Sequence, residues 1–108
     1  MSVRLHVACA EVAPGTVVDG SIDGRFVVVW RTLDGVLVAG EGRCPHQWSP
    51  LDREGLVDGE ELVCVAHGWR FATDGTGTKV NVKGRRDPKA DLTSYPCREV
   101  EGQIWVDL

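Results

Sequence analysis

Two short segments of the chain each pair a cysteine with a histidine. One residue separates Cys44 from His46, and two residues separate Cys64 from His67. The two couples follow one another with 17 residues between His46 and Cys64. Two soft thiolates and two imidazoles suit zinc or an iron–sulfur cluster. Because Gly and Pro punctuate both segments, the couples are predicted to lie on irregular loops that close around one metal group.

Zinc is the first alternative for these residues. Structural zinc sites also use Cys and His, but they usually place about two to four residues between paired cysteines and about three to five between paired histidines. A single residue between Cys44 and His46 departs from that spacing. A second alternative is a chance meeting of buried cysteines and core histidines. Each couple alone is weak evidence for a metal site, whereas the two together at this separation are strong evidence.

Length and composition bound the class of protein. We expect residues 1–108 to form a single small domain, whose limited core a metal group would help to stabilise. No run of apolar residues is long enough for a membrane span, and the N-terminal segment shows no signal core, so a cytoplasmic location is expected. The net charge of −4 argues against nucleic acid as a partner.

The chain is predicted to be all-β. Clusters of β-branched and aromatic residues alternate with turn pairs such as Asp34-Gly35, Asp58-Gly59 and Glu101-Gly102. The continuous apolar run within Arg25–Arg31 predicts a buried strand. The other expected strands are Val3–Val7, Thr16–Val18, Val36–Ala39, Glu61–Val65, Trp69–Thr73, Tyr95–Val100 and Gln103–Asp107. Many short strands with frequent turns are typical of a sandwich or barrel.

With its two couples, Pro50-Leu51 after the first and Gly68-Trp69-Arg70-Phe71 after the second, the chain resembles the Rieske family. The resemblance implies the Rieske iron–sulfur fold, an antiparallel β-sandwich or barrel base with a cluster-binding subdomain of two loops, here at about residues 43–51 and 63–71. It implies one 2Fe–2S cluster as the cofactor. Its predicted ligands are Cys44 and Cys64 on the inner iron and His46 and His67 on the outer iron.

Within the Rieske family, the chain resembles the short soluble ferredoxins. That resemblance implies a one-electron carrier that passes electrons from a flavin-dependent ferredoxin reductase to a terminal oxygenase of bacterial aromatic-ring dioxygenase systems. Rieske subunits of cytochrome bc complexes carry a membrane anchor and an extra cysteine pair, for which this chain has Ser49 and Ala66. The alternative is a non-catalytic subunit or detached domain of a larger redox enzyme, such as the small subunit of an assimilatory nitrite reductase.

We expect no catalytic residues and no enzyme activity of the chain itself. A Rieske oxygenase also needs a mononuclear iron held by two histidines and a carboxylate. The chain has 3 histidines, and only His6 lies outside the two couples. The sequence also lacks a phosphate-binding glycine loop and a nicotinamide or flavin fingerprint.

The resemblance also predicts a low reduction potential. In high-potential relatives a Ser and a Tyr stand two and four residues after the second His and donate hydrogen bonds to sulfur. Trp69 and Phe71 occupy those positions here. Phe71 has no donor, so the potential is expected at the low end of the Rieske range, on the order of −150 mV.

Charges and aromatic residues around the couples indicate where partners dock. Asp52, Glu54, Asp58, Glu60 and Glu61 outnumber Arg53, and this acidic run beside the expected cluster is interpreted as a docking surface. The basic segment Lys79–Lys89 is expected to be a solvated loop of unknown role. An apolar docking patch and plain loop packing are both open for the residues that flank the ligands, namely Pro45, Trp48, Pro50 and Trp69.

The remaining Cys and His residues are assigned no site. Cys9 and Cys97 are expected to be free, partly buried thiols, although a disulfide between them stays open. His6 is expected to be an ordinary strand residue.

Overall fold

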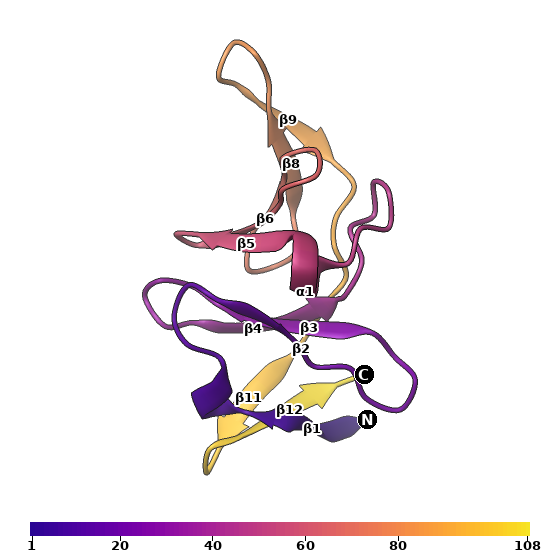
Figure 1. The fold of residues 1–108 in the computed structure, drawn as a ribbon, viewed down its shortest axis with the longest axis vertical. Helices are drawn as coiled ribbons and strands as arrows, with labels where there is room; N and C mark the ends of the chain where they lie inside the picture. The colour runs from indigo at the N-terminus through magenta and orange to yellow at the C-terminus, as the bar shows by residue number, and fades with distance from the viewer.

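Three antiparallel sheets are stacked one above another in the structure, a computed structural model that describes residues 1–108 (Figure 1). The lower sheet has the strand order β1-β12-β11, the middle sheet β10-β4-β3-β2, and the upper sheet β5-β6-β7-β8-β9. The lower and middle strands are β1 (Ser2–Ala8), β11 (Cys97–Val100), β12 (Gln103–Asp107), β2 (Val17–Asp19), β3 (Val27–Arg31), β4 (Leu37–Glu41) and β10 (Ser94–Tyr95). The upper strands are β5 (Gly55–Asp58), β6 (Glu61–Cys64), β7 (Trp69–Phe71), β8 (Gly77–Val80) and β9 (Arg86–Lys89).

Helical structure is confined to two short pieces. A 3₁₀ turn spans Cys9–Glu11, and the helix α1 spans Leu51–Glu54 between the middle and upper sheets. Gly55 ends α1 and starts β5, and a Cβ atom there would lie 2.3 Å from the carbonyl oxygen of Leu51. Only glycine fits at position 55, because a Cβ atom would collide with this carbonyl oxygen. No helix is long and apolar enough to cross a membrane.

The middle sheet has a hydrophobic core on each of its faces. Alternate residues of β3 point to opposite sides, as the pleat of a strand requires. Val28 and Trp30 join the upper core, and Val27 and Val29 join the lower core. The predicted burial of this strand is therefore confirmed, and the continuous apolar run reflects a strand covered on both faces.

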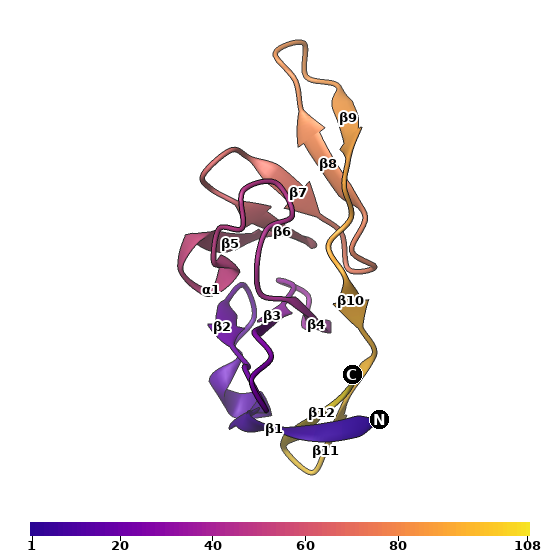
Figure 2. The same ribbon diagram turned by 90° about the vertical axis from the view of Figure 1, so that its right-hand side faces the viewer.

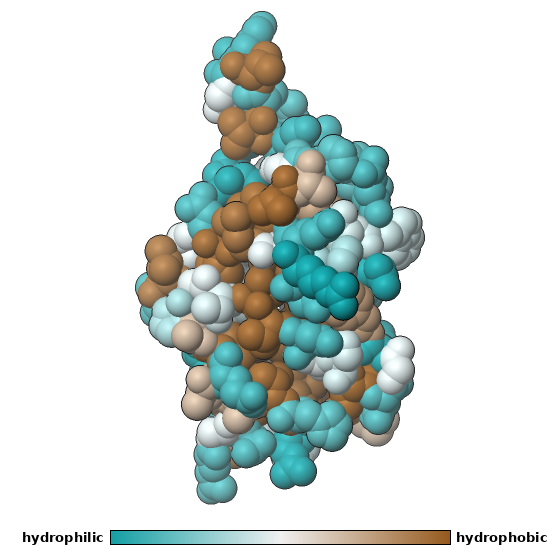
Figure 3. Space-filling view, viewed as in Figure 1, coloured by the Kyte–Doolittle hydropathy of each residue, from teal (hydrophilic) through white to brown (hydrophobic).

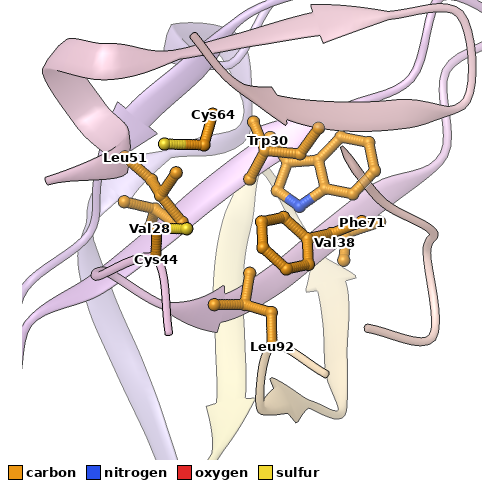
Figure 4. Packing of buried hydrophobic residues seen from close by; sticks show 9 residues of the cluster. Val28, Trp30, Val38, Cys44, Leu51, Cys64, Phe71 and Leu92 are labelled. Carbon is orange, nitrogen blue, oxygen red and sulfur yellow. The ribbon is translucent and has the colours of Figure 1, made fainter. Parts of the chain in front are cut away.

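The upper core packs the middle sheet against the upper sheet, and the lower core packs it against the lower sheet. The upper core also contains Val38, Cys44, Leu51, Leu62, Cys64, Phe71 and Leu92. The lower core also contains Leu5, Val12, Ile22, Ala39, Ile104 and Val106. The expected cluster cysteines thus belong to the upper core, between the middle and upper sheets (Figure 4).

The all-β fold class is confirmed, but several strand boundaries differ from the prediction. The segment Tyr95–Val100 is not one strand, because Pro96 has no N–H and separates β10 in the middle sheet from β11 in the lower sheet. The strand predicted over Arg25–Arg31 begins at Val27, since Arg25 forms a bridge with Ile22 around a tight turn. The short strand β5 was not predicted; it pairs with β6 across Asp58-Gly59.

The segment Lys79–Lys89 was expected to be a solvated loop, but most of it forms two paired strands and the turn between them. The segment makes most of the β8–β9 hairpin, which projects from the upper end of the molecule (Figures 1 and 2). Asn81 closes its turn, because its carbonyl accepts from the Gly84 N–H at 2.9 Å. Pro88 is tolerated because β9 is an edge strand. The hairpin is solvated as expected, and its exposed hydrophobic residues, Val80 and Val82, account for the apolar surface near its tip (Figure 3).

Candidate metal centre

The first Cys–His couple lies on the loop between β4 and α1. The Cys44 N–H donates to the Ser49 carbonyl at 2.9 Å, and the Trp48 N–H donates to the Cys44 carbonyl at 2.8 Å. A bridge between Arg43 and Pro50 closes the base of this loop. Cys44 therefore sits at the base, and His46 is carried toward the tip. Figure 2 shows this loop on the side of the molecule that faces the viewer.

The second couple lies on the loop between β6 and β7, which has the same construction. Cys64 pairs with Trp69 in the sheet register, and the Gly68 N–H donates to the Cys64 carbonyl at 2.8 Å. In both loops the carbonyl of the cysteine accepts from the N–H four residues later. The two loops thus place a cysteine at the base and a histidine farther out, although their sequences share little else.

The residue four positions after each cysteine has a left-handed backbone. Its φ is +76° at Gly68 and +61° at Trp48. Glycine adopts this conformation without strain, whereas a bulky aromatic residue rarely does. The side chain of Trp48 is 68% exposed, so core packing does not account for its presence there.

The two cysteines form the buried end of the site. Cys44 is 1% exposed and Cys64 is 2% exposed, and Figure 4 shows their side chains beside Leu51 and Val28. Burial, and to a smaller extent the neighbouring Cys64 thiol, raise the pKa of Cys44 to about 11. The backbone N–H groups of His46 and Gln47 oppose this rise by donating to the Cys44 sulfur. No disulfide joins the cysteines, so both sulfurs are available as ligands.

The two histidines form the exposed end. Their ring centroids lie 4.7 Å apart with an interplanar angle of 86°. The ring of His46 also stacks on Trp69 at 4.6 Å, with an interplanar angle of 11°. Desolvation and the positive charges of His67, Lys79 and Lys89 lower the pKa of His46. Both imidazoles are exposed, so an edge of each is open to solvent or a partner.

The two tryptophans near the ligands have different environments. Trp69 is half-buried and supports the His46 ring, which fits the loop-packing interpretation. Trp48 projects into solvent, which leaves it available as an apolar contact.

Two acids of the acidic run, Asp58 and Glu61, form ion pairs within the protein. Glu61 binds Arg70 at 2.8 Å and Arg86 at 2.5 Å, and Asp58 also binds Arg70. Hydrogen bonds first from Arg86 and then from Arg70 hold the pKa of Glu61 below its ordinary value. The charges of Asp58 and Glu61 are therefore balanced by arginines of the upper sheet, and the docking role of the acidic run stays a prediction.

Sequence reasoning missed the arginine partners and the place of the lysines. Lys79 and Lys89 act on His46 although they belong to a segment expected to be a loop. The spacing of Asn81 and Gly84, which close the hairpin turn, was the available signal for two strands bringing these lysines together.

The remaining sulfur and imidazole groups stand apart from this site. Cys9 and Cys97 are half-buried free thiols, as expected, and no disulfide links them. The Cys97 thiol instead contacts the carbonyl of Leu37 at 3.6 Å. His6 is an exposed residue of β1 in the lower sheet.

The four residues are suited to a two-iron cluster. They form a buried thiol pair and an exposed imidazole pair, and no three Cys, His, Asp or Glu side chains lie close enough together to hold a single metal ion. A tetrahedral zinc site requires four ligands around one point. A cluster with two thiolates on one iron and two imidazoles on the other requires two separate pairs.

Comparison with protein families gives the same result. A family model described as the Rieske [2Fe-2S] domain matches residues 4–96. The 4β-methylsterol monooxygenase of Methylococcus capsulatus is 39% identical over 87 residues, which are 77% of this chain and 23% of that protein. The chain therefore spans about a quarter of the length of this curated relative.

Solved structures of two kinds share the fold. The ferredoxin of carbazole 1,9a-dioxygenase from Nocardioides aromaticivorans has a TM-score of 0.78 and 25% identity, and the match covers 98% of this chain and 96% of that one. The terminal oxygenase of carbazole 1,9a-dioxygenase from Novosphingobium has a TM-score of 0.76 and 27% identity, with 97% of this chain but only 29% of the oxygenase covered. The same domain thus occurs alone and as part of a longer chain.

Proposed function

Because the chain belongs to the Rieske [2Fe-2S] domain family, we propose that it is a one-electron carrier in a multicomponent oxidoreductase system. Its cofactor is one Rieske-type 2Fe–2S cluster, which accepts and releases one electron at a time. The observation that carries the proposal is the division of the site into a buried thiol pair and an exposed imidazole pair. That division gives the cluster a protected end and an end that a partner can reach.

The proposed ligands are the four residues of the two couples. Cys44 and Cys64 hold the inner iron, where N–H groups of the first loop donate to the Cys44 sulfur. His46 and His67 hold the outer iron through one ring nitrogen each and leave the other toward the surface. The cluster-binding subdomain then consists of the loops at about residues 43–51 and 63–71, and residues 1–108 act as a single domain.

The proposed partners are a flavin-dependent ferredoxin reductase as donor and a terminal oxygenase as acceptor. The likeness to the carbazole 1,9a-dioxygenase ferredoxin over nearly the whole of both chains supports this assignment. The chain's own residues do not supply a second iron site, since His6 lies on β1 and away from the couples. We therefore propose a role in electron transfer without catalysis, in the cytoplasm.

A second candidate function is a non-catalytic Rieske subunit, or the Rieske part of a larger redox enzyme such as a nitrite reductase or an oxygenase. The observation that favours it is that the match with the methylsterol monooxygenase covers only 23% of that protein. The two functions differ in whether the chain works while detached from its partner.

The test is a reconstituted electron-transfer assay together with purification from the native host. A free carrier should be isolated on its own, accept one electron per chain in a dithionite titration, and deliver it to hexacyanoferrate(III) without loss of its spectrum over repeated cycles. Isolation only in a stable stoichiometric complex would favour the subunit. A chain that takes up no electrons would refute both functions.

A further inference from the structure

The upper sheet has two faces of different chemistry. Trp69 of β7 pairs with Cys64 of β6 on one side and with Lys79 of β8 on the other. Directly paired residues of antiparallel strands project to the same face of a sheet. Lys79 pairs with Asp87 of β9, and Lys89, two residues farther on, projects to the same face as Asp87. Both lysines therefore share the face of the cluster cysteine.

These lysines lie beside the exposed end of the site. The Lys89 Nζ is 5.8 Å from the centroid of the Trp69 ring, which stacks on His46. Neither Lys79 nor Lys89 forms an ion pair within 4.0 Å. Lys89 is exposed, and Lys79 is half-buried.

The paired acids occupy the opposite face. Glu61 lies one residue before Leu62 and three before Cys64 along β6, so its side chain projects to the opposite face of the sheet. Asp58 pairs with Glu61 across the strands and shares that face. Their charges are balanced there by Arg70 and Arg86. On the lysine face, the Asp87 carboxylate accepts from the Asn81 side chain at 3.3 Å near the hairpin turn.

We propose that Lys79 and Lys89 form a cationic docking surface beside His46, which receives the acidic face of a redox protein. The proposal rests on the proposed function, because it names the chemistry of the partner at the end from which the electron leaves. The chain as a whole has a net charge of −4, so this surface is opposite in sign to the rest of the molecule. Such an asymmetric field steers an acidic partner to one end of the carrier.

The experiment uses small oxidants of opposite charge as probes of the local field. The dithionite-reduced protein is mixed with the anion hexacyanoferrate(III) or the cation hexaammineruthenium(III) in a stopped-flow instrument. In each case one electron leaves the cluster, and the oxidant is reduced from the +III to the +II state. Rates are followed as the ionic strength rises from about 0.01 M, where charges are screened over about 30 Å, to about 1 M, where screening acts within about 3 Å.

The native protein should react with hexacyanoferrate more slowly as salt is added, because the anion is attracted to the lysines. The double variant K79E/K89E should reduce that rate about tenfold at low salt and should accelerate hexaammineruthenium. The matched control is K83E/R85E, which makes the same change in charge at the exposed hairpin turn, beyond the Val80–Arg86 pair that ends the β8–β9 pairing. The control should change both rates by much less.

Several outcomes would overturn the proposal. One is a hexacyanoferrate rate that rises with salt, since net charge alone then governs approach. Another is an equal effect of the two double variants. A third is an unchanged hexacyanoferrate rate in K79E/K89E together with lost binding to vesicles of an anionic lipid, because the lysines would then serve a membrane surface. If K79E/K89E loses the cluster, K79Q/K89Q replaces it, with about half the effect expected. Failure of the proposed function would show earlier, as a protein with no cluster to reduce.

Discussion

The buried and exposed ends of the metal centre differ although the same two loops build both. Cys44 and Cys64 are almost inaccessible, while His46 and His67, only two or three residues farther along, are exposed. A tight turn follows each cysteine, closed by a hydrogen bond from the N–H four residues later. The chain therefore passes from the core to the surface within a few residues. If the four residues hold the cluster as proposed, the buried cysteines should matter most for stability and the exposed histidines most for electron transfer.

Removing a cysteine should break the buried end and have the largest effect. Cys44→Ala or Cys64→Ala should abolish the cluster and lower the free energy of unfolding by roughly 3 kcal/mol or more, because ligation free energy is also folding free energy. Visible absorption and chemical denaturation would measure both losses. Cys9→Ser and Cys97→Ser are the controls, and loss of the cluster in either would show that the ligands are wrongly assigned.

Changing a histidine to cysteine should alter the exposed end without emptying the site. His46→Cys or His67→Cys should retain a cluster, because a thiolate can replace an imidazole on iron. The added negative charge should move the reduction potential down, toward the value of about −400 mV typical of all-cysteine plant-type ferredoxins. Protein-film voltammetry gives the potential, and an upward shift would contradict the assignment of that histidine.

The substitution Phe71→Tyr should have a smaller effect, in the opposite direction. Phe71 is fully buried in the upper core with the two cysteines. A hydroxyl added there needs a hydrogen-bond partner, and a cluster sulfur can provide it. If the hydrogen bond from the new hydroxyl to the sulfur is stronger by about 1 kcal/mol in the reduced cluster, the reduction potential rises by on the order of 50 mV. A native potential well above zero, or a fall in the variant, would count against a low-potential carrier.

Neutralising Glu61 should change stability and leave the redox properties alone. Since Arg86 and Arg70 hold the pKa of Glu61 below its ordinary value, this ion pair stabilises the fold above the unfolded pKa of about 4.3 and is lost as the pH falls through the lower folded value. Glu61→Gln should therefore cost about 1 kcal/mol at neutral pH, with the difference from the native protein disappearing in acid. Thermal melts across pH measure the effect. A shift in the reduction potential would mean that the face of the upper sheet with Asp58 and Glu61 also acts on the cluster.

The smallest effect is expected from Trp48→Gly at the exposed end. Gly68 already occupies the equivalent left-handed position in the other loop. Relief of backbone strain and the greater freedom of glycine in the unfolded chain oppose one another, so the free energy of unfolding should change by less than about 1 kcal/mol. The absorption spectrum should stay unchanged. A variant that unfolds or loses the cluster would show that Trp48 is a structural residue of the loop.

The sequence predicted the features that depend on local spacing. The two Cys–His couples, the turns at Asp34-Gly35 and Glu101-Gly102 and the buried strand β3 all follow from residue type and order within a few positions. The family and its cofactor followed from the couples, and the family model matches this chain.

Features that depend on long-range pairing were not predicted. Glu61 meets Arg86 across 25 positions in the chain, and Lys89 reaches Trp69 only through the register of three strands. Charge counts along the sequence placed acids beside the site, whereas strand alternation turns Asp58 and Glu61 to the opposite face and lysines toward it. The face on which each of these charges lies is therefore set by the pairing of the strands.

The most direct test of the two-ended site is the electron paramagnetic resonance spectrum of the reduced protein, recorded with its iron and acid-labile sulfide content. We expect a red-brown protein with two irons and two sulfides per chain and a Rieske-type signal, the signature of an iron with two imidazole ligands. One zinc per chain with no visible absorption, or a signal typical of an all-cysteine cluster, would show that the four residues do not hold a Rieske cluster.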